Sequence, residues 1–265
     1  MKDQLNRTIH FTNTPKRIIS LVPSQTELLV DLGLENNIIG ITKFCVHPKH
    51  LKKTKTIVGG TKTIHIDKIK ALQPDIILCN KEENTQEMIV ELEQIAPVHI
   101  SDIYTIDNCL ELIEMYGKLF SKEIEAEKLI DNISKKLEDF KTFVSNKKRL
   151  KIAYFIWKSP WMVAAKQTFI DEILHLNNFE NYYEKYERYP EIKLNSNELE
   201  AADVVFLSSE PFPFKQEHVE EIRKFFPKAT ILVVDGEMFS WYGTRLLKAF
   251  DYFKTLHQNH LILNA

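Results

Sequence analysis

Residues 121–144 carry a long, uninterrupted helical pattern. The stretch contains neither glycine nor proline, the residues at which helices most often kink or end. Its apolar residues recur at helical spacing: Ile124, Ile130, Ile133, Leu137, Phe140 and Val144. At 1.5 Å per residue such a helix would span about 36 Å, which is long for a globular protein. We therefore predict one long helix that connects the residues before it to the residues after it.

Before this helix the chain alternates between short apolar runs and helical patterns. Arg17–Val22 is rich in β-branched residues and predicts a buried strand, which Pro23 ends. Ser24–Glu27 has a capping-box pattern, and the helix that it opens should end at Gly33. Further strands are predicted at 38–41, 75–79 and 98–100, and further helices at 66–72, 84–94 and 107–120. This order of elements is typical of an α/β unit with a parallel sheet.

The residues after the long helix repeat the alternation. Strands are predicted at 151–156, 204–207 and 230–234, and helices at 168–176, 196–201, 217–226 and 242–256. Asp75–Leu78 with Glu82 aligns without gaps with Asp203–Phe206 and Glu210, which indicates two related halves. We predict an α/β fold of two lobes, each with a mainly parallel sheet, joined by one long α-helix, with a ligand cleft between the lobes. The predicted domains are residues 1–120, the connecting helix 121–146, and residues 147–265.

Charge and motifs exclude several classes of function. The 265 residues include 35 basic and 37 acidic side chains, and a net charge of -2 gives no general attraction for nucleic acid. Gly59–Thr63 lacks the spacing of a phosphate-binding loop and no GxGxxG occurs, so nucleotide binding is not expected. Three cysteines without a CxxC exclude a disulfide scaffold. We expect a monomer with no intrinsic cofactor and no nucleic-acid partner.

Aromatic residues gather just after the predicted strands. Ligands of open α/β sheets bind outside the carboxyl ends of the strands. All three tryptophans, Trp157, Trp161 and Trp241, lie in such positions, and so does Phe214. These residues predict a wide and rather apolar binding cleft. The alternative is that the aromatic side chains cover the sheet edges as part of the core.

Cys45 and His47 follow the second predicted strand. At i and i+2 in an extended segment their side chains point to one side, and a thiolate with an imidazole suits zinc, copper or iron. A closed zinc site needs four ligands, for which Glu82 and Glu83 are the nearest candidates. The alternatives are a half-buried cysteine with a histidine at a turn, or a nucleophile pair, which such close neighbours seldom form. An enzyme is the least expected class.

Eight segments carry a family resemblance: RIISLVPSQTELLVDLGL, GITKFCVHP, VGGTK, IDKIKALQPDIILCN, WKSPWMVAAKQTFIDEIL, RYPEI, LSSEPFPF and DGEMFSWYGTRL. Together they resemble the helical-backbone substrate-binding proteins of ABC importers, most closely the branch that binds cobalamin and other metal chelates. The resemblance runs from about Arg17 to the C-terminus. It implies two α/β lobes joined by one long helix, with the ligand held between them.

The resemblance also implies site residues. The ligand-binding candidates are Pro23, Ser24, Gln25, Phe44, His47, Trp157, Trp161, Phe214, Trp241, Tyr242 and Arg245. Cys45 and His47 are candidates for contact with the metal. The ligand would be cobalamin or another iron or cobalt chelate; the alternatives are a haem or siderophore receptor, or a cytosolic metal sensor that uses Cys45 and His47.

The implied partners are the membrane subunits of an importer. Relatives have a docking glutamate near the position of Gln86, which is not acidic, so the neighbouring Glu87 is the candidate, together with Glu210. The first seven residues contain no apolar segment, so a cytoplasmic location is favoured; the alternative is a periplasmic or lipid-anchored protein whose signal was removed.

Overall fold

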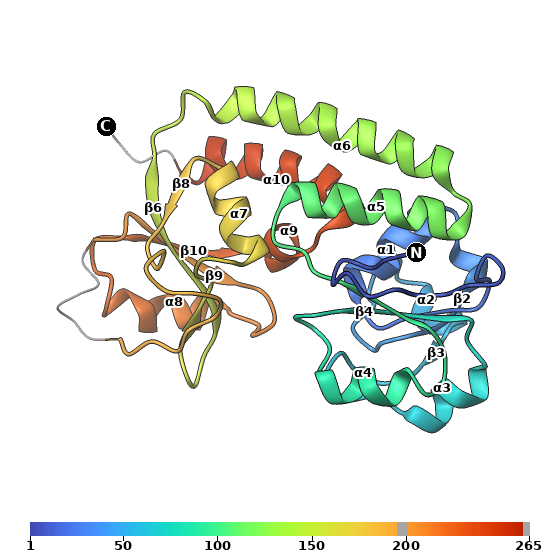
Figure 1. Ribbon diagram of the computed structural model, residues 1–265. Coiled ribbons are helices and arrows are strands. Elements are labelled where there is room, and N and C mark those ends of the chain that lie inside the picture. Colours follow the sequence, from blue (N-terminus) through green and yellow to red (C-terminus); the bar gives the residue numbers. More distant parts are fainter. Residues whose placement is uncertain (195–200, 262–265) are drawn as a thin grey trace. The chain divides into compact units, whose positions relative to one another are not determined.

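The computed structural model describes residues 1–194 and 201–261, and the chain forms two compact units (Figure 1). The first unit comprises Met1–Ile133 and Tyr242–Arg245, and the second comprises Ser134–Trp241 and Leu246–Ala265. Each unit contains a sheet whose strands are mainly parallel, accompanied by helices, which confirms the predicted α/β class.

The domain limits 1–120, 121–146 and 147–265 stay a prediction. The boundary between the compact units falls within the long helix, between Ile133 and Ser134. Tyr242–Arg245 returns to the first unit although the residues on both sides of it belong to the second. The chain therefore passes from one unit to the other more than once.

The sheet of the first unit is parallel throughout and has the strand order β3-β2-β1-β4-β5. Its strands are β1 (Ile18–Ser20), β2 (Ile38–Ile41), β3 (Thr56–Ile57), β4 (Ile76–Asn80) and β5 (Val98–Ser101). The helices of this part of the chain are α1 (Pro23–Asp31), η1 (Glu35–Asn37), α2 (Leu51–Thr54), α3 (Ile66–Leu72), α4 (Gln86–Leu92) and α5 (Ile106–Phe120). Every residue of β4 is buried, as its continuous apolar run predicts.

Helix α1 begins two residues earlier than predicted. Ser24 was expected to cap it, but the helix starts at Pro23, with the extended residue Val22 as N-cap and no side-chain cap. Proline suits the first helical position because its missing N–H would have no partner there. The predicted end at Gly33 is confirmed: its φ is 76°, and Leu34 N–H donates to Leu29 O at 2.9 Å in the manner of a Schellman motif.

The second unit has a sheet of strand order β10-β9-β6-β7, with β8 also paired to β6. Its strands are β6 (Leu150–Trp157), β7 (Met162–Val163), β8 (Phe179–Asn181), β9 (Val204–Ser208) and β10 (Thr230–Val234). The helical elements from here on are α7 (Phe169–Leu176), α8 (Gln216–Arg223), α9 (Gly236–Ser240), η2 (Gly243–Arg245) and α10 (Leu246–Asn259). Among the strands of the described residues in this sheet, only β7 is antiparallel to its neighbour. The helix predicted at 196–201 lies almost entirely outside the described residues.

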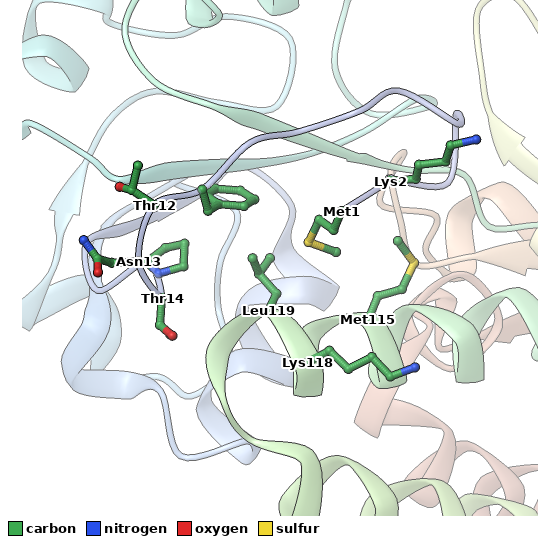
Figure 2. Close-up of a pocket in the computed structure, with 10 residues that line it drawn as sticks. Met1, Lys2, Thr12, Asn13, Thr14, Met115, Lys118 and Leu119 are labelled. Carbon is green, nitrogen blue, oxygen red and sulfur yellow. The ribbon is translucent and has the colours of Figure 1, made fainter.

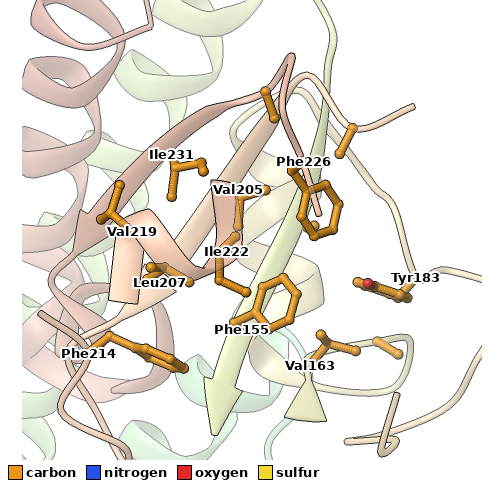
Figure 3. Close-up of a cluster of buried hydrophobic side chains, with 14 residues drawn as sticks. Phe155, Val163, Tyr183, Val205, Leu207, Phe214, Val219, Ile222, Phe226 and Ile231 are labelled. Atoms are coloured by element: carbon orange, nitrogen blue, oxygen red, sulfur yellow. The ribbon is translucent and has the colours of Figure 1, made fainter. Parts of the chain in front are cut away.

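The core of the second unit packs the sheet against α8 and the residues that follow it (Figure 3). Phe155 of β6, Leu207 of β9 and Ile222 of α8 lie together in one buried cluster. The rings of Phe155 and Phe226 meet edge to face with centroids 6.0 Å apart. Trp161 packs on the rim of this cluster, so the aromatic residues after the strands rest on a well-packed base.

The long helix predicted over 121–144 is confirmed as α6, Glu123–Val144. Ile133, in its middle, is fully buried. The assignment of Ile124 to the same apolar face is wrong, since 81% of Ile124 is exposed. Ile124 precedes Ile133 by about two and a half turns and so lies on the opposite face. Among the described residues no helix is long and apolar enough to cross a membrane.

The sequence echo between the two halves has a structural counterpart. The Asp75 carboxylate accepts backbone N–H bonds from Lys16 and Arg17, at 2.8 and 3.0 Å, at the start of β1. The Asp203 carboxylate accepts the corresponding bond from Lys151, at 2.8 Å, in β6. In both units an aspartate before one strand thus fixes the backbone of the neighbouring strand.

Candidate functional site

Gln25 lies at the centre of a buried hydrogen-bond network in the first unit. Its amide nitrogen donates to Ser101 Oγ at 2.6 Å and to Tyr242 Oη at 2.9 Å. Its amide oxygen accepts from Tyr116 Oη at 2.6 Å. Pro23 and Ser24 are buried beside it. The structure therefore brings the predicted ligand residues Gln25 and Tyr242 together, and their polar groups bind one another.

His99 lies beside this network, and neither of its ring nitrogens has a hydrogen-bond partner among the described residues. Its ring meets Tyr116 edge to face at 5.3 Å. Burial lowers the pKa of His99 to about 4; the charge of Asp3 opposes this shift, and the charge of Arg7 adds to it. His99 is therefore neutral in the folded chain at pH values where an unfolded chain takes up the proton.

We expect this difference to make the first unit acid-sensitive. As the pH falls from 6.5 towards 4 the unfolded state gains a proton at His99 that the folded state does not, so stability falls. At about 1.4 kcal/mol per pKa unit the loss approaches about 3 kcal/mol. His99→Phe should remove this part of the pH dependence. Urea unfolding at several pH values gives the free energy of unfolding as a function of pH. The same dependence on pH in the wild type and in His99→Phe would contradict the prediction.

Arg245 is held in a buried ion pair. Its Nε donates to Glu27 Oε2 at 2.9 Å, and both side chains are almost completely removed from solvent. Glu27 belongs to α1, which carries Pro23, Ser24 and Gln25. The guanidinium that the sequence assigned to the ligand thus has a carboxylate partner inside the first unit.

The segment after β2 places its three candidate residues differently. Phe44 is 49% exposed, whereas Cys45 is fully buried. The thiol of Cys45 lies 3.1 Å from Thr26 Oγ1 and 3.3 Å from Thr42 Oγ1. Burial raises the pKa of this thiol and so disfavours the thiolate that binds metals. His47 is half-buried.

No group of three or more histidine, cysteine, aspartate or glutamate side chains in the described residues is arranged to hold a metal ion. Direct contact of Cys45 or His47 with a metal stays a prediction. The structure gives Cys45 a second role, because its thiol and backbone fasten the turn that carries Phe44.

Four aromatic side chains gather in the second unit where β6 and β9 end, and we call them the aromatic cluster: Trp157, Trp161, Phe212 and Phe214. Trp161 stacks on Phe214, with ring centroids 6.1 Å apart and an angle of 7° between the ring planes. Trp157, 38% exposed, meets Phe212 edge to face at 5.8 Å. Phe212 was not among the predicted site residues, although the Phe-Pro-Phe run after a strand is the signal that could have identified it.

Trp241 and Glu210 bind each other. The indole N–H of Trp241 and the hydroxyl of Ser240 both donate to Glu210 Oε1 at 2.8 Å. Burial raises the pKa of Glu210. The other docking candidate, Glu87, is exposed in the first turn of α4, where its own backbone N–H and the Thr85 hydroxyl lower its pKa.

A cavity of about 670 Å³ lies elsewhere, beside the N-terminal segment and α5 (Figure 2). Its lining comes from Met1 and Lys2, Phe11 to Pro15, and Met115, Lys118 and Leu119. A second cavity, of about 430 Å³, is lined by residues 7–10 and 93–98. Neither cavity includes a predicted site residue.

This chain aligns with relatives of known sequence over more than two thirds of its length. An uncharacterized ABC transporter substrate-binding lipoprotein, YvrC of Bacillus subtilis, is 27% identical over 68% of this chain and 59% of its own length. The vitamin B12-binding protein of Vibrio campbellii is 25% identical over 75% of this chain and 73% of its own length. The chain thus aligns with less than two thirds of the first relative. Both relatives are described as binding proteins.

Solved structures share the fold. The periplasmic vitamin B12 binding protein BtuF of Vibrio cholerae superposes with a TM-score of 0.78 at 19% identity, over 93% of this chain and 99% of that one. The periplasmic heme binding protein HutB of the same species superposes with a TM-score of 0.77 at 18% identity, over 91% of this chain and 98% of that one.

The expected cytoplasmic location is wrong. The first relative is a lipoprotein of an ABC transporter, and the superposed structures are of periplasmic proteins. The polar character of the first seven residues describes only that segment and carries no information about where the folded chain works.

The family itself is identified by a match over most of the chain. The model of the periplasmic binding protein family matches residues 18–225, which include all strands of the first unit and β6 to β9 of the second. This stretch holds the turns after β1 and β2 and the whole aromatic cluster. The chain belongs to the periplasmic binding protein family.

Proposed function

We propose that this chain delivers a metal chelate to an ABC importer and that the chelate is a corrinoid of the vitamin B12 type. The observation that carries the proposal is the aromatic cluster after β6 and β9, in which Trp157 keeps 38% of its surface exposed while it meets Phe212 edge to face. A flat macrocycle gains from stacking and burial against such side chains. The vitamin B12-binding relatives support this choice of ligand.

In this proposal the predicted site residues have two kinds of role. Phe44, Trp157 and Trp161 contact the ligand, because their rings retain exposed surface. Gln25, Tyr242, Arg245 and Trp241 hold the surrounding backbone through buried hydrogen bonds. His47 is the residue that would contact the metal of the chelate.

Haem is the second candidate ligand. Lys43 Nζ lies 5.0 Å from the centroid of the Phe44 ring, so a cation stands beside a flat apolar surface. Such a pair suits a planar macrocycle with carboxylate substituents. The superposition with a heme binding protein supports this alternative.

The importer is the proposed partner, and Glu87 is the stronger docking residue of the two. It is exposed, and the lowered pKa of its carboxyl keeps it ionised. Glu210 accepts two internal hydrogen bonds, which leaves it less available for an ion pair with another protein.

Calorimetric titration with cyanocobalamin and with hemin tests the ligand. We expect one-to-one binding of cyanocobalamin with quenching of tryptophan emission. Trp157→Ala should weaken it by about tenfold or more, since it removes a stacking surface. Val233→Ala, at an exposed apolar residue of β10, is the control and should bind as the wild type does. No heat with either ligand at about 100 µM would exclude affinities better than about -5.5 kcal/mol and overturn the proposal.

A further inference from the structure

The turn that carries Phe44 is held on several sides although Phe44 itself is half exposed. Lys43 N–H donates to Gly59 O at 2.8 Å and Cys45 N–H donates to Thr42 O at 3.1 Å. Phe44 N–H donates to Thr42 Oγ1 at 3.3 Å. The backbone on both sides of Phe44 is therefore fixed before a ligand binds. Packing of a ligand on the ring then costs little further conformational entropy of this segment.

Gly60 provides the space in which this ring lies. A Cβ at Gly60 would stand 3.2 Å from Phe44 Cε2 and 3.5 Å from Lys43 Cε. The first distance is tighter than an ordinary van der Waals contact, so an added methyl group would push the ring. Gly59 differs, because its φ is 131° and its Cβ would stand 2.5 Å from Thr63 O. A substitution at Gly60 thus tests the effect of filling the space beside the ring, without the backbone strain that a substitution at Gly59 would add.

The loop that contains Gly60 cannot easily move away from the ring. Gly60 N–H donates to Thr63 O at 2.6 Å across the tip of the loop. Asn84 Nδ2 donates to Thr61 O at 2.9 Å, and Lys62 Nζ donates to Glu82 O. These bonds tie the loop to the segment after β4, so the exposed ring of Phe44 is the partner that gives way.

We propose that Gly60 is a positioning residue that sets where the Phe44 ring stands, and that this ring is a stacking surface for the flat face of a macrocyclic chelate. The inference rests on the proposed function and deepens it. Gly60 does not touch the ligand; it acts through Phe44. Gly59-Gly60 is the single Gly-Gly pair of the sequence and lacks the spacing of a phosphate-binding loop. In this proposal its second glycine positions the Phe44 ring.

A double-mutant cycle tests the coupling, with cyanocobalamin as the probe, or hemin if the wild type binds hemin alone. Phe44→Ala should weaken binding by about tenfold or more, and Gly60→Ala by about three- to tenfold. The double variant should bind no more weakly than Phe44→Ala, because without the ring the added methyl group has nothing to displace. Phe44→Trp should retain binding, since it keeps a flat ring.

The control is Val90→Ala, at an exposed apolar residue of α4, which should bind as the wild type does. Circular dichroism establishes that each variant is folded. Wild-type affinity in Gly60→Ala, or additive losses in the double variant, would overturn the positioning role and leave the proposed function standing. Absence of binding by the wild type to both probes would overturn the proposed function and this inference with it.

Discussion

Glu27→Gln should lower the free energy of unfolding by about 3–5 kcal/mol, because it leaves the buried guanidinium of Arg245 without its carboxylate. Both side chains of this pair are less than a tenth exposed, so water cannot replace the lost partner. The Nε to Oε2 distance of 2.9 Å is that of a charge-assisted hydrogen bond. Urea unfolding followed by circular dichroism gives the loss as a shift of the midpoint.

Two further variants separate the buried charge from other effects of the substitution. Replacing both partners, with Glu27→Leu and Arg245→Met, should restore most of the stability, because no unpaired charge is left. Glu138→Gln breaks a surface pair with Lys141 on α6 and should change the unfolding free energy by less than about 1 kcal/mol. If Glu27→Gln costs no more than Glu138→Gln, the pair does not hold Tyr242–Arg245 in the first unit.

This pair also shows what the sequence could not reveal. The helix predicted from Tyr242 begins instead at Leu246, after a turn in which Gly243 has a φ of 84°. Glu27 and Arg245 are 218 positions apart, and periodicity reports only on neighbours within a few turns. The sequence therefore could not reveal that Arg245 pairs with Glu27, and contact of Arg245 with a ligand stays a prediction.

Elements with a strong local pattern were predicted well. The helix at 66–72 and the strand at 230–234 have the bounds that the sequence indicates. Strand β7 was missed because two residues are too few to show a period, and its existence depends on pairing with β6. Tertiary context, not propensity, decides such short elements.

The same limit applies to the candidate site, because a sequence shows local patterns but not tertiary contacts. Aromatic residues after strands are visible in a sequence, and three members of the aromatic cluster, Trp157, Trp161 and Phe214, were named in advance. Burial of an individual side chain is not visible, so the sequence could not reveal that the Cys45 thiol faces two threonine hydroxyls; its contact with a metal stays a prediction. Gly60 carried no signal at all, because its importance lies in one distance to Phe44.

Ile133→Ala should destabilise the chain by about 2–5 kcal/mol. Ile133 is fully buried in the middle of α6, and alanine would leave a cavity where its branched side chain packs. Alanine is the best helix former, so the loss would report packing and not helix propensity. The size of the loss within this range depends on how far the surrounding side chains can move into the cavity.

Ile124→Ala is the matched control, since it makes the same substitution on the same helix at a residue that is 81% exposed. It should change the free energy of unfolding by less than about 0.5 kcal/mol, as surface substitutions usually do. Urea unfolding of both variants at one pH gives the comparison. Equal effects would mean that α6 is not held by the face that carries Ile133, and a loss at Ile124 alone would mean that the opposite face is the packed one.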